Sequence, residues 1–530
     1  MGVGVNQLEN GQWLEVLERE VVAGVVRRER DLRVLYSQDV LGKGAVALAV
    51  LSPGNADELA RCVKIAAEAD VALLPRGGGM SYTSGYVPQH ENSVIVDLGR
   101  MNRILEINAE DMYVTVEAGC TWQALYDALK DTGLRTPFWG TLSGRFATVG
   151  GGLSQNSVFW GTSQFGPAAD SVVSMDIVLA DGSIMSTGSA AHSNGNAFHR
   201  HYGPDLTGVF VGDTGALGFK ATVTLRLIPQ RPARDGLSFA ADDADSLIAF
   251  ASDVSRAQVA SEVFGFDPYL QAQRMKRESL AADVKALAGV MKSAGGIGKA
   301  LKKGARVAVA GRGYMKDVKF SLHVLVEEAC EAAVKHNMAV VRELAKKHGM
   351  RELENSIPTI LRANPFGPVN NMIGPSGERW LPVHGVIPHS RVQAVYDGIE
   401  AVFEEHRELI EQFEIGTGYL FATVGPNAFV LEPVFFWPDE LNEWHREAVE
   451  DDYLQRIKGF PANEAARNAV LRLRKALCDV FVRHGAVHMQ IARAYPYGEV
   501  LDESAWSLVK SLKSTLDPKG CINPGALGLD

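Results

Sequence analysis

Residues Leu73–Gly85 read LLPRGGGMSYTSG, and this stretch decides the fold. An apolar run ends at Pro75 and Arg76, and three consecutive glycines, Gly77–Gly79, follow directly. Glycine costs backbone entropy, so a flexible turn is one interpretation of the triplet. The other is a backbone that approaches a phosphate closely, with its N–H groups turned toward the anion. The triplet alone leaves both interpretations open.

The residues before the triplet predict an α/β unit. Residues 45–51 are a short apolar run, and Ser52-Pro53-Gly54 ends it. Asn55 is a good cap for a helix whose apolar residues share one face, and residues 71–75 are the next buried strand. The glycines therefore stand at the exit of a strand, where ligand-binding loops are commonly built.

Two further glycine-rich loops follow. Residues 147–162 read ATVGGGLSQNSVFWGT, and residues 205–227 read DLTGVFVGDTGALGFKATVTLRL. Between them, Asp181-Gly182 joins two short strands as a hairpin turn. The sequence contains no GxxxxGK[ST] P-loop and no GxGxxG that opens a helix. Three such loops at strand edges suit a long, extended cofactor that is not held in the way nicotinamide enzymes hold theirs.

Size and composition limit the alternatives. A chain of 530 residues is too long for one core, so two or three domains are expected. After about residue 231 long helical stretches alternate with a few strands, which predicts a second, α+β domain. No run of eighteen apolar residues occurs, and the net charge of −10 disfavours nucleic-acid binding. Five scattered cysteines without a CxxC pair indicate a reducing compartment, so a cytoplasmic protein is expected.

Four motifs in order carry a resemblance. They are LPRGGGMSYTSG at 74–85, the two later glycine-rich loops, and LDPKGCINPG at 516–525. Together they resemble the FAD-linked oxidases of the vanillyl-alcohol oxidase and p-cresol methylhydroxylase superfamily, most of all the branch with FAD-dependent D-lactate and glycolate dehydrogenases. The resemblance implies an α+β fold. Its expected parts are an N-terminal helical segment at 1–40, a two-subdomain FAD-binding domain at 41–230, an α+β cap (substrate) domain at 231–490, and a C-terminal segment at 491–530 that returns to the FAD domain.

The same resemblance assigns residues to FAD. The first loop would bind the pyrophosphate through backbone N–H groups, the second would follow the diphosphate, ribityl chain and isoalloxazine, and the third would lie near the adenine. The assigned residues are Pro75, Arg76, Gly77, Gly78, Gly79, Met80, Ser81, Gly85, Thr141, Thr148, Gly151, Ser154, Asn156, Gly161, Gly215, Phe219 and Asn523, the last closing on the flavin. Some relatives attach FAD through a histidine in the first loop; Met80 stands near that place here, which predicts non-covalent FAD.

The chemistry implied is hydride removal from a carbon next to oxygen or an aromatic ring, with a base for the hydroxyl proton. The D-lactate branch usually carries an HxGDGNxH-like metal cluster and a Glu-His pair, which residues 418–436 and 484–499 lack. No metal is therefore expected, which weakens the hydroxy-acid assignment. If residues 488–490 form a strand, His488 and Gln490 share one face. The catalytic candidates are His488, Arg493, Tyr495, Tyr497, His384 and Glu432. The competing interpretation for each is ordinary packing.

Three functions follow from these residues. The first is a dehydrogenase of a small D-2-hydroxy acid that passes electrons to a quinone, cytochrome or oxygen. The second is an oxidase or dehydrogenase of a para-hydroxylated aromatic substrate, with Tyr495, Tyr497 and Arg493 holding a phenolate. The third is a non-catalytic scaffold that binds FAD. The sequence leaves the acceptor and the oligomeric state open, a homo-oligomer included.

Residues 284–316 carry eight basic side chains and no acidic one, in an otherwise acidic protein. One hypothesis is a surface that touches anionic lipid and brings the flavin near a membrane acceptor. A solvated helix and loop, or contact with an acidic partner, is the alternative. Gly295, Gly296 and Gly298 would interrupt a helix here.

Overall fold

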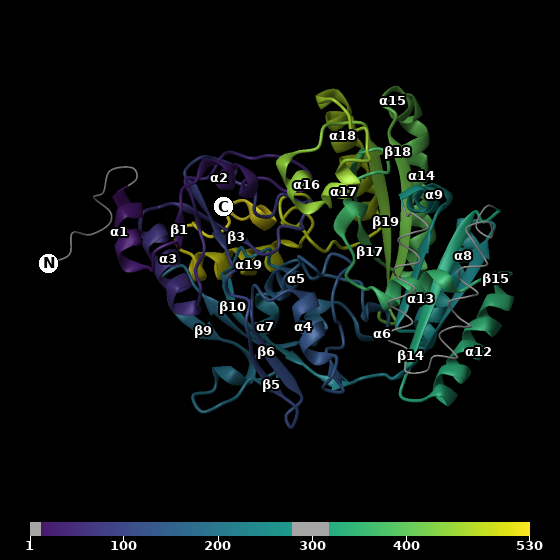
Figure 1. The fold of residues 1–530 in the computed structure, drawn as a ribbon, viewed down its shortest axis with the longest axis horizontal. Coiled ribbons are helices and arrows are strands. Elements are labelled where there is room, and N and C mark those ends of the chain that lie inside the picture. The colour runs from purple at the N-terminus through teal and green to yellow at the C-terminus, as the bar shows by residue number, and fades with distance from the viewer. Residues whose placement is uncertain (1–11, 278–316) are drawn as a thin grey trace.

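A computed structural model describes residues 12–277 and 317–530. It is an α+β structure, as predicted, and its described strands lie mainly in three sheets. In Figure 1 the purple and blue elements and the yellow C-terminal segment occupy one half, and the teal and green elements occupy the other. The basic stretch 284–316 falls outside the described residues. None of the described helices is long and apolar enough to cross a membrane.

The first sheet contains the strand that delivers the glycine triplet. Its order is β1-β2-β4-β3, and β4 pairs in parallel with both β2 and β3. The strands are β1 (Val26–Arg27), β2 (Ala49–Leu51), β3 (Ala72–Arg76) and β4 (Ser93–Asp97), with helices α1 (Gln12–Glu20), α2 (Arg30–Tyr36) and α3 (Ala56–Glu68). The Asn55 side chain caps α3 by accepting from the Glu58 N–H. The predicted strand, helix and second strand are thereby confirmed.

The second sheet is antiparallel, in the order β5-β6-β10-β8-β9. Its strands are β5 (Ile104–Asn108), β6 (Tyr113–Glu117), β8 (Val172–Val178), β9 (Ile184–Ser186) and β10 (Phe219–Arg226), and a small separate sheet pairs β7 (Leu134–Arg135) with β11 (Ile228–Pro229). The β8–β9 hairpin turns at Gly182, whose φ is +81°, as its Asp-Gly pair predicts. The helices of this part are α4 (Trp122–Leu129), α5 (Val149–Ser154), α6 (Thr162–Phe165) and α7 (Leu206–Val209), with short 3-10 turns η2 (Ala168–Ser171) and η3 (Gly188–Ala191).

The third and largest sheet runs in the order β15-β12-β14-β13-β18-β19-β16, and β17 also pairs with β19. Its strands are β12 (Ala233–Ala241), β13 (Glu262–Phe266), β14 (Phe320–Glu328), β15 (Arg351–Leu353), β16 (Arg379–Pro382), β17 (Gly385–Pro388), β18 (Gly416–Val424) and β19 (Ala428–Trp437). The helices are α8 (Ala244–Ala257), α9 (Pro268–Arg277), α12 (Glu331–Lys347), α13 (Ser356–Ala363), α14 (Val392–Glu405), α15 (Arg407–Gln412), α16 (Glu443–Ala448), α17 (Asp451–Leu454) and α18 (Glu464–Arg483), with 3-10 turns η5 (Val369–Met372) and η6 (His389–Arg391). We call the part built on this sheet the cap.

The C-terminal residues return to the first two sheets. Helix α19 (Glu503–Leu516) is anchored by Lys513, whose ammonium donates to the Ala216 carbonyl at 2.9 Å. Ile522 forms a parallel bridge with Leu73, so the chain end extends the sheet that carries β3. The 3-10 turn η7 (Ala526–Gly528) follows. The third sheet thus begins at Ala233, after the strands of the first two sheets, and the C-terminal segment returns to those sheets.

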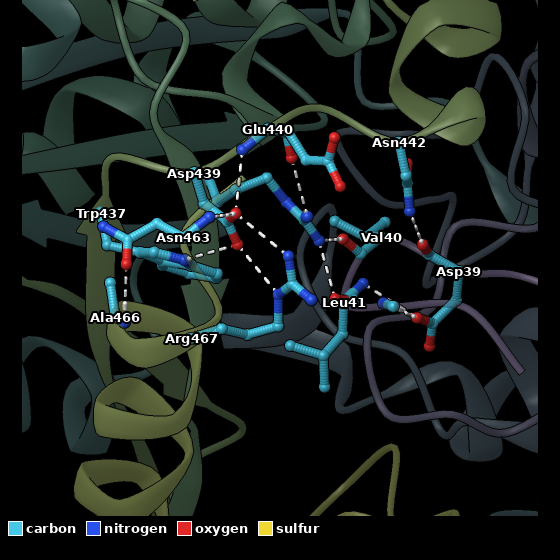
Figure 2. A network of polar contacts seen from close by, with 12 residues as sticks. Asp39, Val40, Leu41, Trp437, Asp439, Glu440, Asn442, Asn463, Ala466 and Arg467 are labelled. Atoms are coloured by element: carbon cyan, nitrogen blue, oxygen red, sulfur yellow. Dashed lines mark hydrogen bonds and ion pairs between the residues drawn. The ribbon is translucent and has the colours of Figure 1, made fainter. Parts of the chain in front are cut away.

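A polar network ties the cap to the loop that precedes β2 (Figure 2). The Arg379 guanidinium donates to the carbonyls of Val40 and Leu41 at 2.6 and 2.7 Å. The Asn442 side chain donates to the Asp39 carbonyl at 2.9 Å. Because Arg379 lies on β16 of the cap and is 2% exposed, this contact between the two parts is buried.

Candidate active site

One cavity of about 270 Å³ lies between the glycine-rich loops and the cap sheet. Many of the residues predicted to hold FAD line it. They are Pro75, Gly77, Gly78, Gly79, Met80, Ser81, Gly85, Thr141, Thr148, Gly151, Ser154, Gly215 and Phe219. The three loops that are far apart in the sequence therefore meet around one space, as a long cofactor requires.

The glycine triplet is shaped by its protein neighbours as well. A Cβ on Gly78 would stand 1.9 Å from the Phe146 carbonyl oxygen, and one on Gly77 would stand 2.4 Å from Thr148 Oγ1. Gly79 has a φ of +69°, which side chains other than glycine rarely adopt. The first two loops thus touch backbone to backbone, and a side chain on the triplet would push them apart.

The second glycine run differs from the prediction, which treated residues 141–156 as a loop. Residues Val149–Ser154 form the short helix α5, and Thr148 caps it by accepting from the Gly151 N–H at 3.2 Å. The reason is close packing: a Cβ on Gly152 would lie 2.8 Å from the Trp122 indole nitrogen. Here the glycines let a helix press against its neighbours, with Thr148 at the cavity wall.

Three of the residues assigned to FAD lie behind the cavity wall. Arg76 stacks over the Tyr36 ring, with its guanidinium carbon 3.9 Å from the ring centroid. The Asn156 side chain accepts from the Ala169 N–H at 3.3 Å. The Gly161 N–H donates to the Glu262 carboxylate. These contacts fix the backbone beside the loops, and the assignment of the three residues to FAD stays a prediction.

Asn523 does not line the cavity either, although it was predicted to close on the flavin. Its side-chain amide donates to the carbonyls of Gly85 at 2.9 Å and Thr214 at 2.8 Å. Its side-chain oxygen accepts from Arg493 at 2.8 Å. Asn523 is completely buried and joins the first loop to the third.

The cap side of the cavity follows the alternation of strands. On β19 every second residue from Val430 to Phe436 lines the cavity, and Leu431 and Phe435 between them enter the cap core. The cavity-lining residues of this wall are Glu262, Val263, Phe264, Leu420, Ala422, Thr423, Val424, Val430, Glu432, Val434 and Phe436. Glu432 is therefore the charged residue of β19 on an otherwise apolar face.

The electrostatics of the two cavity carboxylates differ. Burial raises the pKa of Glu432 to about 7, and Arg274, which also lines the cavity, partly offsets the rise. Burial raises the pKa of Glu262 well above its ordinary value, against the hydrogen bond from Gly161. A carboxyl group that loses its proton near neutral pH suits proton transfer, whereas one with a higher pKa stays neutral.

The remaining catalytic candidates do not line the cavity. His488 stacks on the buried Tyr495, with 4.3 Å between their ring centroids, and the buried His384 packs at a tilt against the same ring. His488 Nδ1 lies 2.8 Å from the His384 carbonyl, and the His384 N–H donates to the Tyr495 hydroxyl at 3.1 Å. Arg493 donates to the Ser84 carbonyl at 2.7 Å. Tyr497 packs edge-on against Trp506.

The predicted strand at residues 488–490 is absent. Gln490 and Ala492 have φ values of +50° and +48°, which an extended strand does not allow. The irregular backbone turns the Gln490 side chain to the cavity, where it donates to the Tyr82 hydroxyl at 3.0 Å, and leaves His488 behind the wall.

Sequence reasoning missed several cavity residues. Tyr82 stood inside the stretch at 73–85, so its neighbourhood was a usable signal, whereas Gln490 was named beside His488 and does line the cavity. Arg274 and Glu262 lie on elements without a local motif, and pairing of the cap strands brings them to the cavity. Within residues 12–277 and 317–530, no three His, Cys, Asp or Glu side chains gather in a metal-binding arrangement.

Comparisons with known proteins agree with this geometry. A family profile described as an FAD binding domain matches residues 47–188. A glycolate oxidase subunit, GlcD, of Bacillus subtilis is 30% identical over 43% of this chain and 47% of its own length. A mitochondrial D-lactate dehydrogenase [cytochrome] of Arabidopsis thaliana is 30% identical over 40% of this chain and 37% of its own length. The matches thus span about half or less of these relatives.

Among solved structures, p-cresol methylhydroxylase with substrate bound superposes with a TM-score of 0.73 at 18% identity, covering 99% of this chain and 98% of that one. A 4-ethylphenol oxidase from Gulosibacter chungangensis gives a TM-score of 0.69 at 16% identity over 99% and 98%. The chain therefore has the fold of p-cresol methylhydroxylase. Its residues 47–188 match an FAD binding domain, which confirms FAD as the cofactor predicted from the four motifs.

Proposed function

We propose that this protein is an FAD-dependent dehydrogenase or oxidase that takes a hydride from the alcohol carbon of a D-2-hydroxy acid. The observation that carries the proposal is Glu432, a half-buried carboxyl group in the wall that faces the FAD loops, whose pKa is raised to about 7. The names of the relatives, a glycolate oxidase subunit and a D-lactate dehydrogenase, support the class of substrate.

The protein residues would divide the work as follows. Arg274 offers a guanidinium to the substrate carboxylate, a pairing that fixes orientation as well as charge. Glu432 accepts the hydroxyl proton while the C–H bond breaks and the carbonyl forms. Bound FAD supplies the acceptor for the hydride. The apolar wall around Glu432 keeps water from the reacting carbon.

The electrons would then pass to a quinone, a cytochrome or oxygen. No described residue selects among these acceptors. We keep the cytoplasm as the proposed location, and contact of residues 284–316 with a membrane remains a hypothesis. Assembly into a homo-oligomer likewise stays a proposal.

A second substrate class is favoured by a specific observation. Phe264, Trp380 and Phe436 line the cavity together with Tyr82, which suits an aromatic ring. A para-hydroxylated benzylic alcohol would place its phenol near Arg274 and its ring against these side chains. In that case Arg274 would stabilise a phenolate.

Anaerobic reduction of the bound flavin distinguishes these candidates. D-Lactate and vanillyl alcohol are mixed in turn with the purified yellow protein, and the loss of visible absorbance is followed. Bleaching by D-lactate supports the proposal, and bleaching by vanillyl alcohol alone supports the second class. If neither these donors nor larger hydroxy acids bleach the flavin, a non-catalytic scaffold that holds FAD is favoured. The Glu432→Gln variant should slow bleaching at least 100-fold while still binding FAD.

A further inference from the structure

Across the β18–β19 and β13–β18 pairings, the cap wall beside Glu432 is apolar. Leu420 stands directly across from Glu432 in the β18–β19 pairing, and Phe266 stands across from Leu420 in the next pair. Val430 and Val434 flank Glu432 on the same face of β19. A substrate whose hydroxyl reaches Glu432 must therefore lie against hydrocarbon.

Part of this wall is a distinct cluster. Phe264, Phe266, Leu270, Val434 and Phe436 pack together, and none is more than 6% exposed. All but Phe266 also line the cavity. The cluster is thus closed to bulk solvent yet borders the space that a ligand would fill. We call these five residues the apolar cluster.

Resting on the proposed function, we infer that the substrate is a 2-hydroxy acid with a bulky apolar side chain, aromatic or branched, that packs on the apolar cluster. A methyl group, as in lactate, would leave most of this surface without a partner. Each added methylene that is buried there should raise the specificity constant about 3- to 4-fold. Arg274 lines the cavity at the edge of this cluster, with its guanidinium stacked on Phe266, and would pair with the carboxylate end.

A series of donors tests this inference. D-Lactate, D-2-hydroxy-4-methylpentanoate and D-3-phenyllactate are compared by the second-order rate of anaerobic flavin bleaching, with L-3-phenyllactate as the enantiomer control. We expect the two larger D-acids to react at least 30-fold faster than D-lactate. Equal or faster reaction of D-lactate would overturn the inference and leave the proposed function intact. Bleaching by no hydroxy acid would overturn the proposed function itself.

A near-isosteric variant tests the role of the apolar cluster directly. Val434→Thr puts a hydroxyl into the wall where Val434 is 2% exposed, and Val500→Thr makes the same change where the side chain is 47% exposed. The phenyllactate-to-lactate rate ratio should fall about 5-fold or more in Val434→Thr and stay constant in Val500→Thr. An unchanged ratio in a Val434→Thr protein that keeps its FAD and its Tm would contradict the inference.

Discussion

The Trp444 indole N–H donates a 2.7 Å hydrogen bond to the Gly79 carbonyl, joining residues that are 365 positions apart. The Tyr86 hydroxyl donates to the same oxygen at 2.8 Å. Trp444 lies on α16 of the cap, and Gly79 is the last glycine of the triplet. The cap therefore fixes the orientation of a peptide group in the loop that faces FAD.

Loss of this bond should weaken FAD binding. Trp444→Phe keeps most of the ring but removes the donor, and one such bond contributes about 1 kcal/mol, or about 5-fold in affinity. Fluorescence titration of the apoprotein with FAD measures the change. Trp506→Phe is the matched control, because Trp506 only makes ring contacts with Tyr497 and Lys510 among the interactions described. Equal dissociation constants for the two variants would show that the bond does not position the loop.

The pH dependence of turnover should report Glu432. A proton acceptor must be ionised, so kcat/KM should rise with pH and level off above about 7, the pKa to which burial raises this group. Glu432→Asp should keep an inflection with lower activity, and Glu432→Gln should lose it. A profile that keeps the same inflection in Glu432→Gln would assign the proton transfer to another group.

The same carboxyl group should affect stability in the opposite direction. The pKa of Glu432 is higher in the folded protein than in the unfolded chain. The free energy of unfolding is therefore greatest below about pH 4.5 and falls as the pH rises through 7. Above pH 7 the ionised carboxylate lowers the free energy of unfolding by at most about 3 kcal/mol. Thermal unfolding should show Glu432→Gln more stable than the parent at pH 8, with the difference shrinking toward pH 5. A constant difference across this range would refute the linkage.

Alanine at position 78 should abolish FAD binding. Its Cβ would meet the Phe146 carbonyl at 1.9 Å, and backbone cannot yield as a flexible side chain does. Absorbance at 450 nm relative to 280 nm measures the bound flavin. Gly42→Ala is the control, because nothing lies within 4 Å of its Cβ and its φ is ordinary. A yellow Gly78→Ala protein would mean that the two loops separate without cost.

FAD should leave the protein on acid denaturation, as Met80 predicts for the first loop. Precipitation with trichloroacetic acid should give a colourless pellet and a yellow supernatant. Colour retained by the pellet would indicate a covalent link formed elsewhere in the chain.

The sequence predicted those structural features that depend on neighbouring residues. The triplet after β3, the cap of α3 and the hairpin at Gly182 each depend on neighbouring residues, and each was predicted. The motif at 516–525 places Asn523 near the loops. It does not reveal the hydrogen bonds of Asn523, because their partners lie hundreds of residues away.

Which catalytic candidates reach the cavity was harder to predict, because long-range contacts decide it. The strand expected at residues 488–490 assumed regular alternation, and two positive φ values break it. Glu432, one of the catalytic candidates, lines the cavity, whereas Arg274 reaches it through the packing of α9 on the cap sheet. Long-range pairing decides such positions, and a single sequence carries no local signal for it.

The bridge between Leu73 and Ile522, with Asn523 beside it, sets an order of events during synthesis. A ribosome makes the first loop early, but the amide that ties it to Thr214 emerges some 450 residues later. The nascent chain cannot close around its cofactor until that asparagine has left the exit tunnel. Capture of the vitamin-derived nucleotide should therefore wait until residue 523 has emerged, and fragments that stop short of position 523 should be colourless.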